Sequence, residues 1–543
     1  MAQRIEESSP APLIPLDGFN AYSDLDHPIP QTSDVVTNFD IRTGILSSIP
    51  VSKFAKNGHL DLPLQRHASR AIPTIENDYI NPEAQPTTDF GLFRMVPLAE
   101  LGTITDQVHE MIKENEIHAS AGGQFPRPFG RDSYITAFGL LEAYKWFPED
   151  EDQQRLPKLL NAIKGMYRFL ASRDFPAAGV EKGKQAHEVG TIDQKYPKEF
   201  YINEYGMGEN YDSLEATDWG ILTADRLLKL DPSIEAEILD RVKEMTEWTI
   251  RNTEEHAGPG YIGASYDPRR YYPGLHDQGW RDGEATTMKN DGTTPTHPIY
   301  RVFEGALRWS ALSHAAQMLA EKNPKLSTQA KDTAAYVKSW FNENFLYEDA
   351  EGVYLAESLD AYHNKITPIT IDSLLALLPS FEGEKIIDDP YIRRDIIRRA
   401  QKELFDPRGG LYTVSKGSFV HPKNTYQNHE AIWPHASAMA VIALENEART
   451  VELDDPELSQ EHRENALKTG KAAAAGLLYW QSTLETFQIK GNQLVYYFHD
   501  GGTQCKQQAW TGGTMEYVYR SLKAQGVTEI PVPVASLNTL NAD

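Results

Sequence analysis

The sequence is poor in the residues that cross-link a chain or carry it through a membrane. Its single cysteine, Cys505, excludes an intramolecular disulfide and a cysteine-rich zinc site. No run approaches the roughly 18 consecutive apolar residues of a membrane span, and residues 1–16 lack the basic start and apolar stretch of a secretory signal. We therefore expect a cytoplasmic protein with no membrane partner.

Basic residues are also fewer than acidic ones. Lys and Arg number 53 against 78 Asp and Glu, which gives a net charge of −25. Because phosphate binding needs a basic surface, this charge argues against a nucleic-acid partner. A neutral ligand such as a carbohydrate suits an acidic chain with 26 Tyr and 9 Trp, although acidity alone also keeps a protein soluble. Neither GxGxxG nor HExxH occurs and the histidines are scattered, so we expect no cofactor and no metal.

Helical periodicity dominates after an irregular start. Residues 1–90 are rich in Pro, Ser, Asp and Asn and predict an irregular N-terminal arm or cap; residues 91–530 predict one helical domain, and 531–543 a C-terminal tail. Capping signals at Asp212/Glu215, Asp231-Pro232, Asn323-Pro324 and Asp389-Pro390 mark helix starts. The expected helices span 97–117, 131–147, 154–173, 212–229, 233–252, 298–322, 326–345, 368–379, 390–404, 429–446, 461–485 and 508–524.

The connections between these helices alternate between short and long. Those that follow the odd-numbered helices are the longer ones, so in an antiparallel arrangement all of them emerge at the same end. Twelve helices in six hairpins predict an all-α fold, a double-layered (α/α)6 toroid, with its functional loops at one mouth. An α-solenoid also has helical hairpins, but no repeat of fixed period supports it.

Chemistry-bearing residues concentrate in these longer loops. Arg131 and Asp132 open the second helix, where an Arg-Asp pair can be a cap with an ion pair or a ligand for sugar hydroxyls. Glu188 lies in the next long loop. The third loop contains Gln278, Trp280 and Asp282. In one interpretation this loop is a polar turn with one buried Trp. In the other, its carboxylic acid packs against an aromatic ring. Desolvation would then raise the pKa of that acid, as a general acid requires.

The last two long loops carry further candidates. One leads through Glu430 to Trp433, and the other follows Glu485 and ends at Gln508 and Trp510. A lone Glu at a helix end, as Glu485 is predicted to be, is commonly a solvated residue.

Read in order, these segments resemble the catalytic domain of amylo-α-1,6-glucosidase (glycogen debranching enzyme)-like (α/α)6 glycoside hydrolases. That group shows Phe-Gly-Arg-Asp-Ser, His-Glu, Tyr-Gly-Ser-Val-Asp-Ala-Thr-Pro, Asn-Gln-Gly-Trp-Lys-Asp-Ser, Tyr-His-Asn-Gly-Ser-Val-Trp-Pro-His and Cys-Ser-Pro-Gln-Ala-Trp. The matching residues are 129–133, 187–188, 211–217, 277–283, 426–435 and 505–510. Each motif is weak by itself, but six in the same order over residues 118–524 indicate the relationship.

The resemblance implies an inverting α-glucosidase in which Asp282 is the general acid and Glu485 the general base. It implies that the sugar subsite is lined by Arg131, Asp132, Glu188, Gln278, Trp280, Trp433, Gln508 and Trp510. The sequence departs from the family where Gln427–Glu430 replace His-Asn-Gly-Ser, which makes Glu430 an alternative base. Only about 90 residues precede the toroid, in place of a large β-rich domain, so we expect a short oligosaccharide or small glucoside as substrate.

Two other classes of function stay open at this point. The same toroid occurs in sugar epimerases and phosphorylases, which do not hydrolyse their substrates. A catalytically degenerate sugar-binding or scaffold protein is the other alternative. The sequence does not indicate an oligomeric state.

Overall fold

The computed structural model describes residues 39–40, 45–46, 93–121, 127–169, 182–190, 201–202, 208–255, 263–264, 278–282, 286–289, 291–418, 431–490, 493–496 and 507–534. The chain divides into two compact units, Met1–Ala84 and Gln85–Asp543. In the first unit, the described residues form the antiparallel strands β1 (Phe39–Asp40) and β2 (Ile45–Leu46). The rest of the predicted arm, residues 1–90, lies outside the described residues.

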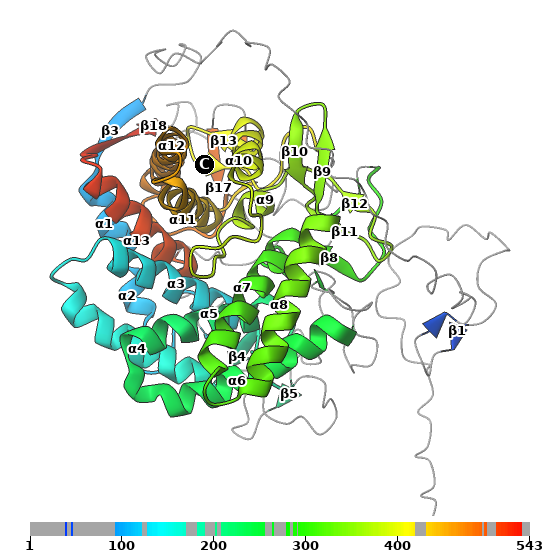
Figure 1. The fold of residues 1–543 in the computed structure, drawn as a ribbon. Coiled ribbons are helices and arrows are strands. Elements are labelled where there is room, and N and C mark those ends of the chain that lie inside the picture. Colours follow the sequence, from blue (N-terminus) through cyan, green and yellow to red (C-terminus); the bar gives the residue numbers. More distant parts are fainter. Residues whose placement is uncertain are drawn as a thin grey trace, which may run out of the picture. The chain divides into compact units, whose positions relative to one another are not determined.

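Among the described residues of the second unit, six helices form an inner ring. Each contacts the next, and the last contacts the first, which closes the ring (Figure 1). Most of them are buried on every side, as expected for helices enclosed by a second layer. They are α3 (Gly130–Trp146), α5 (Glu215–Leu230), α7 (Val302–Leu319), α9 (Asp372–Leu375), α11 (Pro434–Val451) and α13 (Ala509–Ala524).

The remaining helices form the outer layer and are amphipathic. For example, α8 buries Leu326, Ala330, Ala334 and Val337 against α7, at the spacing of one helical face. The outer helices are α1 (Leu98–Thr105) with α2 (Val108–Met111), α4 (Asp152–Phe169), α6 (Glu235–Glu255), α8 (Pro324–Asn344), α10 (Pro390–Leu404) and α12 (Pro456–Trp480). The predicted (α/α)6 toroid is confirmed.

Several predicted helix limits are also confirmed, because their caps form as expected. The side chain of Asn323 accepts from Leu326 N, and that of Asp389 accepts from Tyr391 N, each with a proline at the first helical position. After Asp231 the chain first makes the short 3-10 helix η4 (Pro232–Ile234) and then α6.

Other predicted limits are wrong for local reasons. Range 97–117 is divided into α1 and α2, and range 368–379 contracts to the single turn α9. The capping box of Asp212 and Glu215 is not formed, because α5 begins at Glu215 itself. Helix α12 starts early at the capping residue Asp455 and ends at Gln481, whose φ of 51° is left-handed, so Glu485 lies beyond the helix.

Short strands occupy the long connections that lead from outer to inner helices. They form the sheets β4-β6-β5, β12-β11-β8-β7, β10-β9, β13-β14 and β15-β16-β17. Their bounds are β4 (Glu188–Gly190), β5 (Tyr201–Ile202), β6 (Gly208–Asn210), β7 (Gly263–Ala264), β8 (Ile299–Arg301), β9 (Leu346–Asp349), β10 (Gly352–Leu355), β11 (Ser358–Leu359), β12 (Lys365–Ile366), β13 (Phe405–Asp406), β14 (Gly410–Leu411), β15 (Ala431–Ile432), β16 (Phe487–Lys490) and β17 (Gln493–Tyr496).

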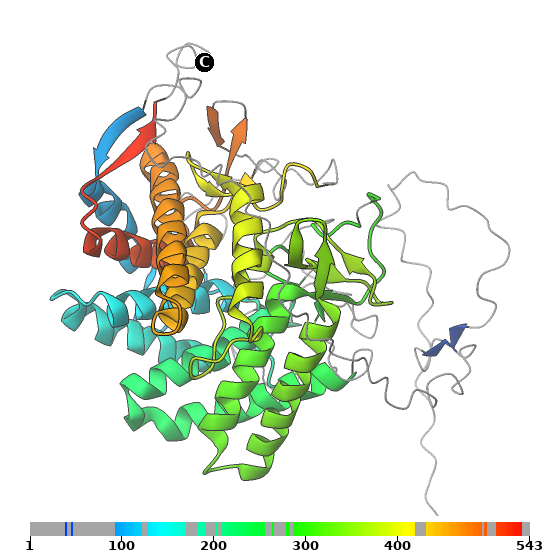
Figure 2. The same cartoon turned by 45° about the horizontal axis from the view of Figure 1, so that its top comes forward.

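One further strand pair joins the two ends of the helical unit. Strand β3 (Phe93–Pro97) runs antiparallel to β18 (Glu529–Pro533), with Phe93 opposite Pro533. The blue and red strands lie side by side in Figure 2. Strand β18 includes residues 531–533, the first of the segment expected to be a tail. Within the described residues, no helix combines the length and apolar character that a membrane crossing requires.

Candidate active site

The first turns of four inner helices each carry a buried carboxylate. They are Asp132 on α3, Glu215 on α5, Glu304 on α7 and Asp372 on α9. The unpaired N–H groups at a helix N-terminus give it a partial positive charge that favours anions. Arg131 of α3 lies 4.0 Å from Glu215 of α5, so these turns lie close together and bring buried acidic groups to one end of the ring.

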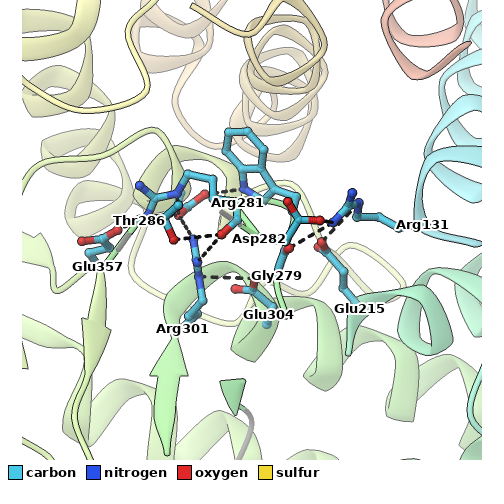
Figure 3. A network of polar contacts seen from close by, with 11 residues as sticks. Arg131, Glu215, Gly279, Arg281, Asp282, Thr286, Arg301, Glu304 and Glu357 are labelled. Carbon is cyan, nitrogen blue, oxygen red and sulfur yellow. Dashed lines mark hydrogen bonds and ion pairs between the residues drawn. The ribbon is translucent and has the colours of Figure 1, made fainter. Parts of the chain in front are cut away.

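The segment Gln278–Asp282 contacts several of these turns. The backbone oxygen of Gln278 accepts from Leu214 N at 3.1 Å, and that of Gly279 accepts from Arg131 Nη1 at 3.0 Å. Gly279 itself lies against Glu304, so that a Cβ on it would come within 2.0 Å of Glu304 Oε1 (Figure 3). A glycine is therefore required here by close packing.

Trp280 and Arg281 turn into the protein and meet at Asp372. The Trp280 indole donates to Asp372 Oδ1 at 2.6 Å, and Arg281 Nε donates to Oδ2 at 2.9 Å. Arg301 binds the same Oδ2 at 2.8 Å, and Arg281 also pairs with Glu357. Although burial opposes it, the charges of Arg281 and Arg301 hold the pKa of Asp372 below its usual value. The segment is thus anchored by a buried ionic network.

Asp282 faces a different cation from the one next to it in sequence. Its Oδ2 lies 3.1 Å from Arg131 Nη1 and 3.7 Å from His187 Nε2, and its side chain is 26% exposed. Arg281 instead binds Asp372. The guanidinium of Arg131 lies at Asp282 (Figure 3). The carboxylate therefore combines one fixed oxygen with partial access to solvent.

Burial shifts the ionisation of the groups around Asp282. It raises the pKa of Asp132 to about 6 although Arg131 opposes the shift, and with help from Glu304 it raises the pKa of Glu215 well above its usual value. Burial lowers the pKa of His187 well below 6.5, so this ring is neutral at pH 7. Strongly shifted groups gathered in one place are typical of active sites, although structural ion pairs shift pKa values too.

Four buried rings pack together next to these acids. Trp280, Trp433 and His435 make mutual edge-to-face contacts with centroids 5.2–5.5 Å apart. His435 stacks flat on Trp510 at 4.0 Å, and Arg131 lies over the Trp510 ring at 5.1 Å. The predicted aromatic residues thus form one cluster, contributed by the segment 278–282, α11 and α13.

Glu485 lies on a segment that is fixed to the same helix starts. Thr483 O accepts from Gln508 N and Leu484 O accepts from Thr511 Oγ1, both at 2.9 Å. Thr486 Oγ1 donates to Ile432 O at 3.0 Å, directly before Trp433. Glu485 itself is half-buried. Hydrogen bonds on both sides therefore tie its segment to the ends of α11 and α13 that carry the aromatic cluster.

Of the other predicted residues, two are buried at the same end of their elements. Glu188 is buried and pairs with Arg127 at 3.3 Å, and Gln508 is buried at the start of α13. Glu430, the alternative base, lies outside the described residues. In the described part of the chain, no three His, Cys, Asp or Glu side chains come together in a way that would hold a metal ion.

The sequence did not predict the buried residues that hold the segment Gln278–Asp282 in place. Arg301, Glu304, Glu357 and Asp372 belong to no predicted motif, and Glu215 was interpreted as a cap. One signal could have identified Glu215, Glu304 and Asp372, because each is an acidic residue in the first turn of an inner helix.

Comparisons with known proteins identify the fold. No family model matches the chain, and no curated protein matches it in sequence. Among solved structures, a glycosidase variant shares 13% identity over 78% of this chain and 98% of its own, with a TM-score of 0.50. Neutral trehalase Nth1 from Saccharomyces cerevisiae shares 12% identity over 75% of this chain and 73% of its own, with a TM-score of 0.48.

A third solved structure belongs to a metal-independent alpha mannosidase from Streptococcus pneumoniae. It shares 15% identity over 79% of this chain and 95% of its own, with a TM-score of 0.45. At these identities the comparisons speak for the fold, which this chain shares with the glycosidase variant.

Proposed function

We propose that this chain is an inverting glycoside hydrolase that acts on an α-glucosidic linkage of a short oligosaccharide or small glucoside. The observation that carries the proposal is the setting of Asp282, whose carboxylate is partly exposed among otherwise buried acids and aromatic rings. The motif order, the acidic site and the toroidal fold support it.

In this proposal Asp282 is the general acid. One of its oxygens accepts from Arg131, and its side chain is 26% exposed, so a bound substrate can reach this carboxyl group. The proton passes to the glycosidic oxygen as the bond from the anomeric carbon to that oxygen breaks, and the aglycone leaves as an alcohol. The excess of buried carboxylates over guanidinium groups around the site favours the positive charge that develops on the sugar.

Glu485 is the proposed general base. It takes one proton from a water molecule while the water oxygen bonds to the anomeric carbon from the opposite face, which inverts the configuration. Such a geometry requires roughly 6.5–9.5 Å between the carboxyl groups, against about 5–5.5 Å for retention. Both acids lie on segments bonded to the N-terminal turns of inner helices, which supports this pairing.

The test is a reducing-sugar screen over kojibiose, trehalose, isomaltose, maltose, sucrose and glucosylglycerate, with product anomers followed by NMR. We expect turnover of one of them with inversion, and loss of most turnover in Asp282→Asn. Near-wild-type activity of that variant would remove Asp282 from the role. Comparison of Glu485→Gln with Glu430→Gln decides between the two candidate bases.

Two outcomes would favour other functions. Turnover that depends on phosphate, or a changed sugar configuration without cleavage, would indicate a phosphorylase or an epimerase. Binding of glucosides without reaction would indicate a sugar-binding protein.

A further inference from the structure

One guanidinium, that of Arg131, is shared by three carboxylates. Its Nε lies 3.2 Å from Asp132 Oδ1 and 4.0 Å from Glu215 Oε1, while its Nη1 lies 3.1 Å from Asp282 Oδ2. Arg131 is itself buried against the Trp510 ring. A single positive charge therefore faces three acidic groups in a region from which water is largely excluded.

Acids that share one cation raise each other's affinity for protons. Like charges close together in a low-dielectric setting disfavour joint ionisation. The effect is visible at Asp132, where burial raises the pKa to about 6, Arg131 opposes the rise and Asp282 adds to it. Because the repulsion between two charges is mutual, Asp132 acts on Asp282 in the same direction.

The other charged groups near this pair are already engaged. His187 is neutral at pH 7 and lies 3.7 Å from Asp282. Arg301 pairs with Glu304 at 3.4 Å on the other side of Gly279, and Arg281 is turned to Asp372 and Glu357. Burial raises the pKa of Glu215 well above its usual value, which disfavours a negative charge there. Asp132 is thus the ionised neighbour that competes most directly with Asp282 for Arg131.

We propose that Asp132 is a positioning residue that acts through Arg131, so that its negative charge keeps the catalytic proton on Asp282. This inference rests on the proposed function, in which Asp282 is the general acid. It differs from a role for Asp132 as a ligand of sugar hydroxyls, because Asp132 is 4% exposed and bonded to Arg131, whereas the Asp282 side chain is 26% exposed.

The kinetic test is the pH profile of Asp132→Asn with the best glucoside of the screen. In this variant the repulsion between Asp132 and Asp282 is gone, and Arg131 no longer shares its charge with Asp132. Both changes favour ionised Asp282. The alkaline limb of kcat/KM should therefore move to lower pH by about one unit, while KM in the acidic range stays within about twofold. A tenfold rise in KM with an unmoved limb would make Asp132 a sugar ligand and overturn the proposal.

A second test needs no activity, so it separates this inference from the proposed function. In full-length protein labelled with 13C at aspartate carboxyl groups, the Asp282 signal is identified by its loss in Asp282→Asn. Its titration midpoint should lie lower in Asp132→Asn than in wild type, and an equal midpoint would refute the proposal. If wild type cleaves no glycoside, the proposed function fails while this titration still decides the inference.

The matched control is Asp218→Asn. Asp218 is buried and paired with Arg308 at 2.8 Å, on the same helix as Glu215 but with a separate cation. Its neutralisation should leave the Asp282 midpoint in place. Should Asp132→Asn fail to fold in a thermal melt, Asp132→Ser removes the same charge with a smaller polar side chain.

Discussion

The indole N–H of Trp280 donates a 2.6 Å hydrogen bond to Asp372, which lies 92 residues further along the chain. Asp372 also binds Arg281 and Arg301. This one carboxylate therefore holds three side chains, two of which belong to the segment that carries Asp282.

We therefore expect Asp372→Asn to reduce both stability and turnover. Removal of one partner from a buried ionic network costs about 3–5 kcal/mol, and a looser segment misplaces Asp282. Urea unfolding and kcat measure the two effects. Asp218→Asn breaks a comparable buried pair with Arg308 and should lose stability without an equal loss of kcat. Equal kcat losses in both variants would refute the special role of Asp372.

Gly279→Ala should disturb the same segment from its backbone side. The added Cβ would meet Glu304 Oε1 at 2.0 Å and Arg301 Nε at 3.3 Å, so the buried ion pair must move. We expect a loss of about 1–3 kcal/mol, the usual cost of overpacking, with a fall in kcat. Gly417→Ala is the control, because a Cβ there meets nothing within 4 Å. A Gly279→Ala protein as stable and active as wild type would contradict the packing argument.

Glu215→Gln should change the pH dependence of stability. Burial and the charge of Glu304 raise the pKa of Glu215 in the folded protein. When folding raises the pKa of a carboxyl group, the folded protein loses stability as the pH rises from the unfolded pKa, about 4.3, towards the folded pKa. The variant lacks this penalty, so its stability relative to wild type should increase with pH above about 4.3. Urea unfolding at several pH values measures it, and a relative stability that decreases with pH would refute the assignment.

His435→Phe should be tolerated. The His435 ring stacks on Trp510, and burial lowers its pKa well below 6.5. Within the described part of the chain neither ring nitrogen has a hydrogen-bond partner, so the imidazole acts as a neutral aromatic ring. We expect a stability change below about 1.5 kcal/mol and an unaltered pH profile. His435→Ala, which removes the ring, should cost at least about 2 kcal/mol. A large loss of kcat in the Phe variant would reveal a polar role.

The sequence predicted the toroid because long amphipathic helices and alternating loop lengths are local properties. Caps such as Asn323-Pro324 could be located to the residue. The ionic network could not be predicted, because Arg281 lies beside Asp282 in sequence but binds Asp372 and Glu357, and the cation of Asp282 is Arg131, 151 residues away. Which of two adjacent side chains points inward depends on tertiary packing. Likewise Glu215 matched a capping pattern, yet the folded helix buries it.

The pairing of β3 with β18 makes the helical unit a suitable subject for circular permutation. Phe93 and Pro533 are register partners, so a short linker could join the two strands. New ends could then be opened between α7 and α8, where residues 321 and 322 are exposed. Such a rearranged chain should still close its ring, because no inner helix would be interrupted.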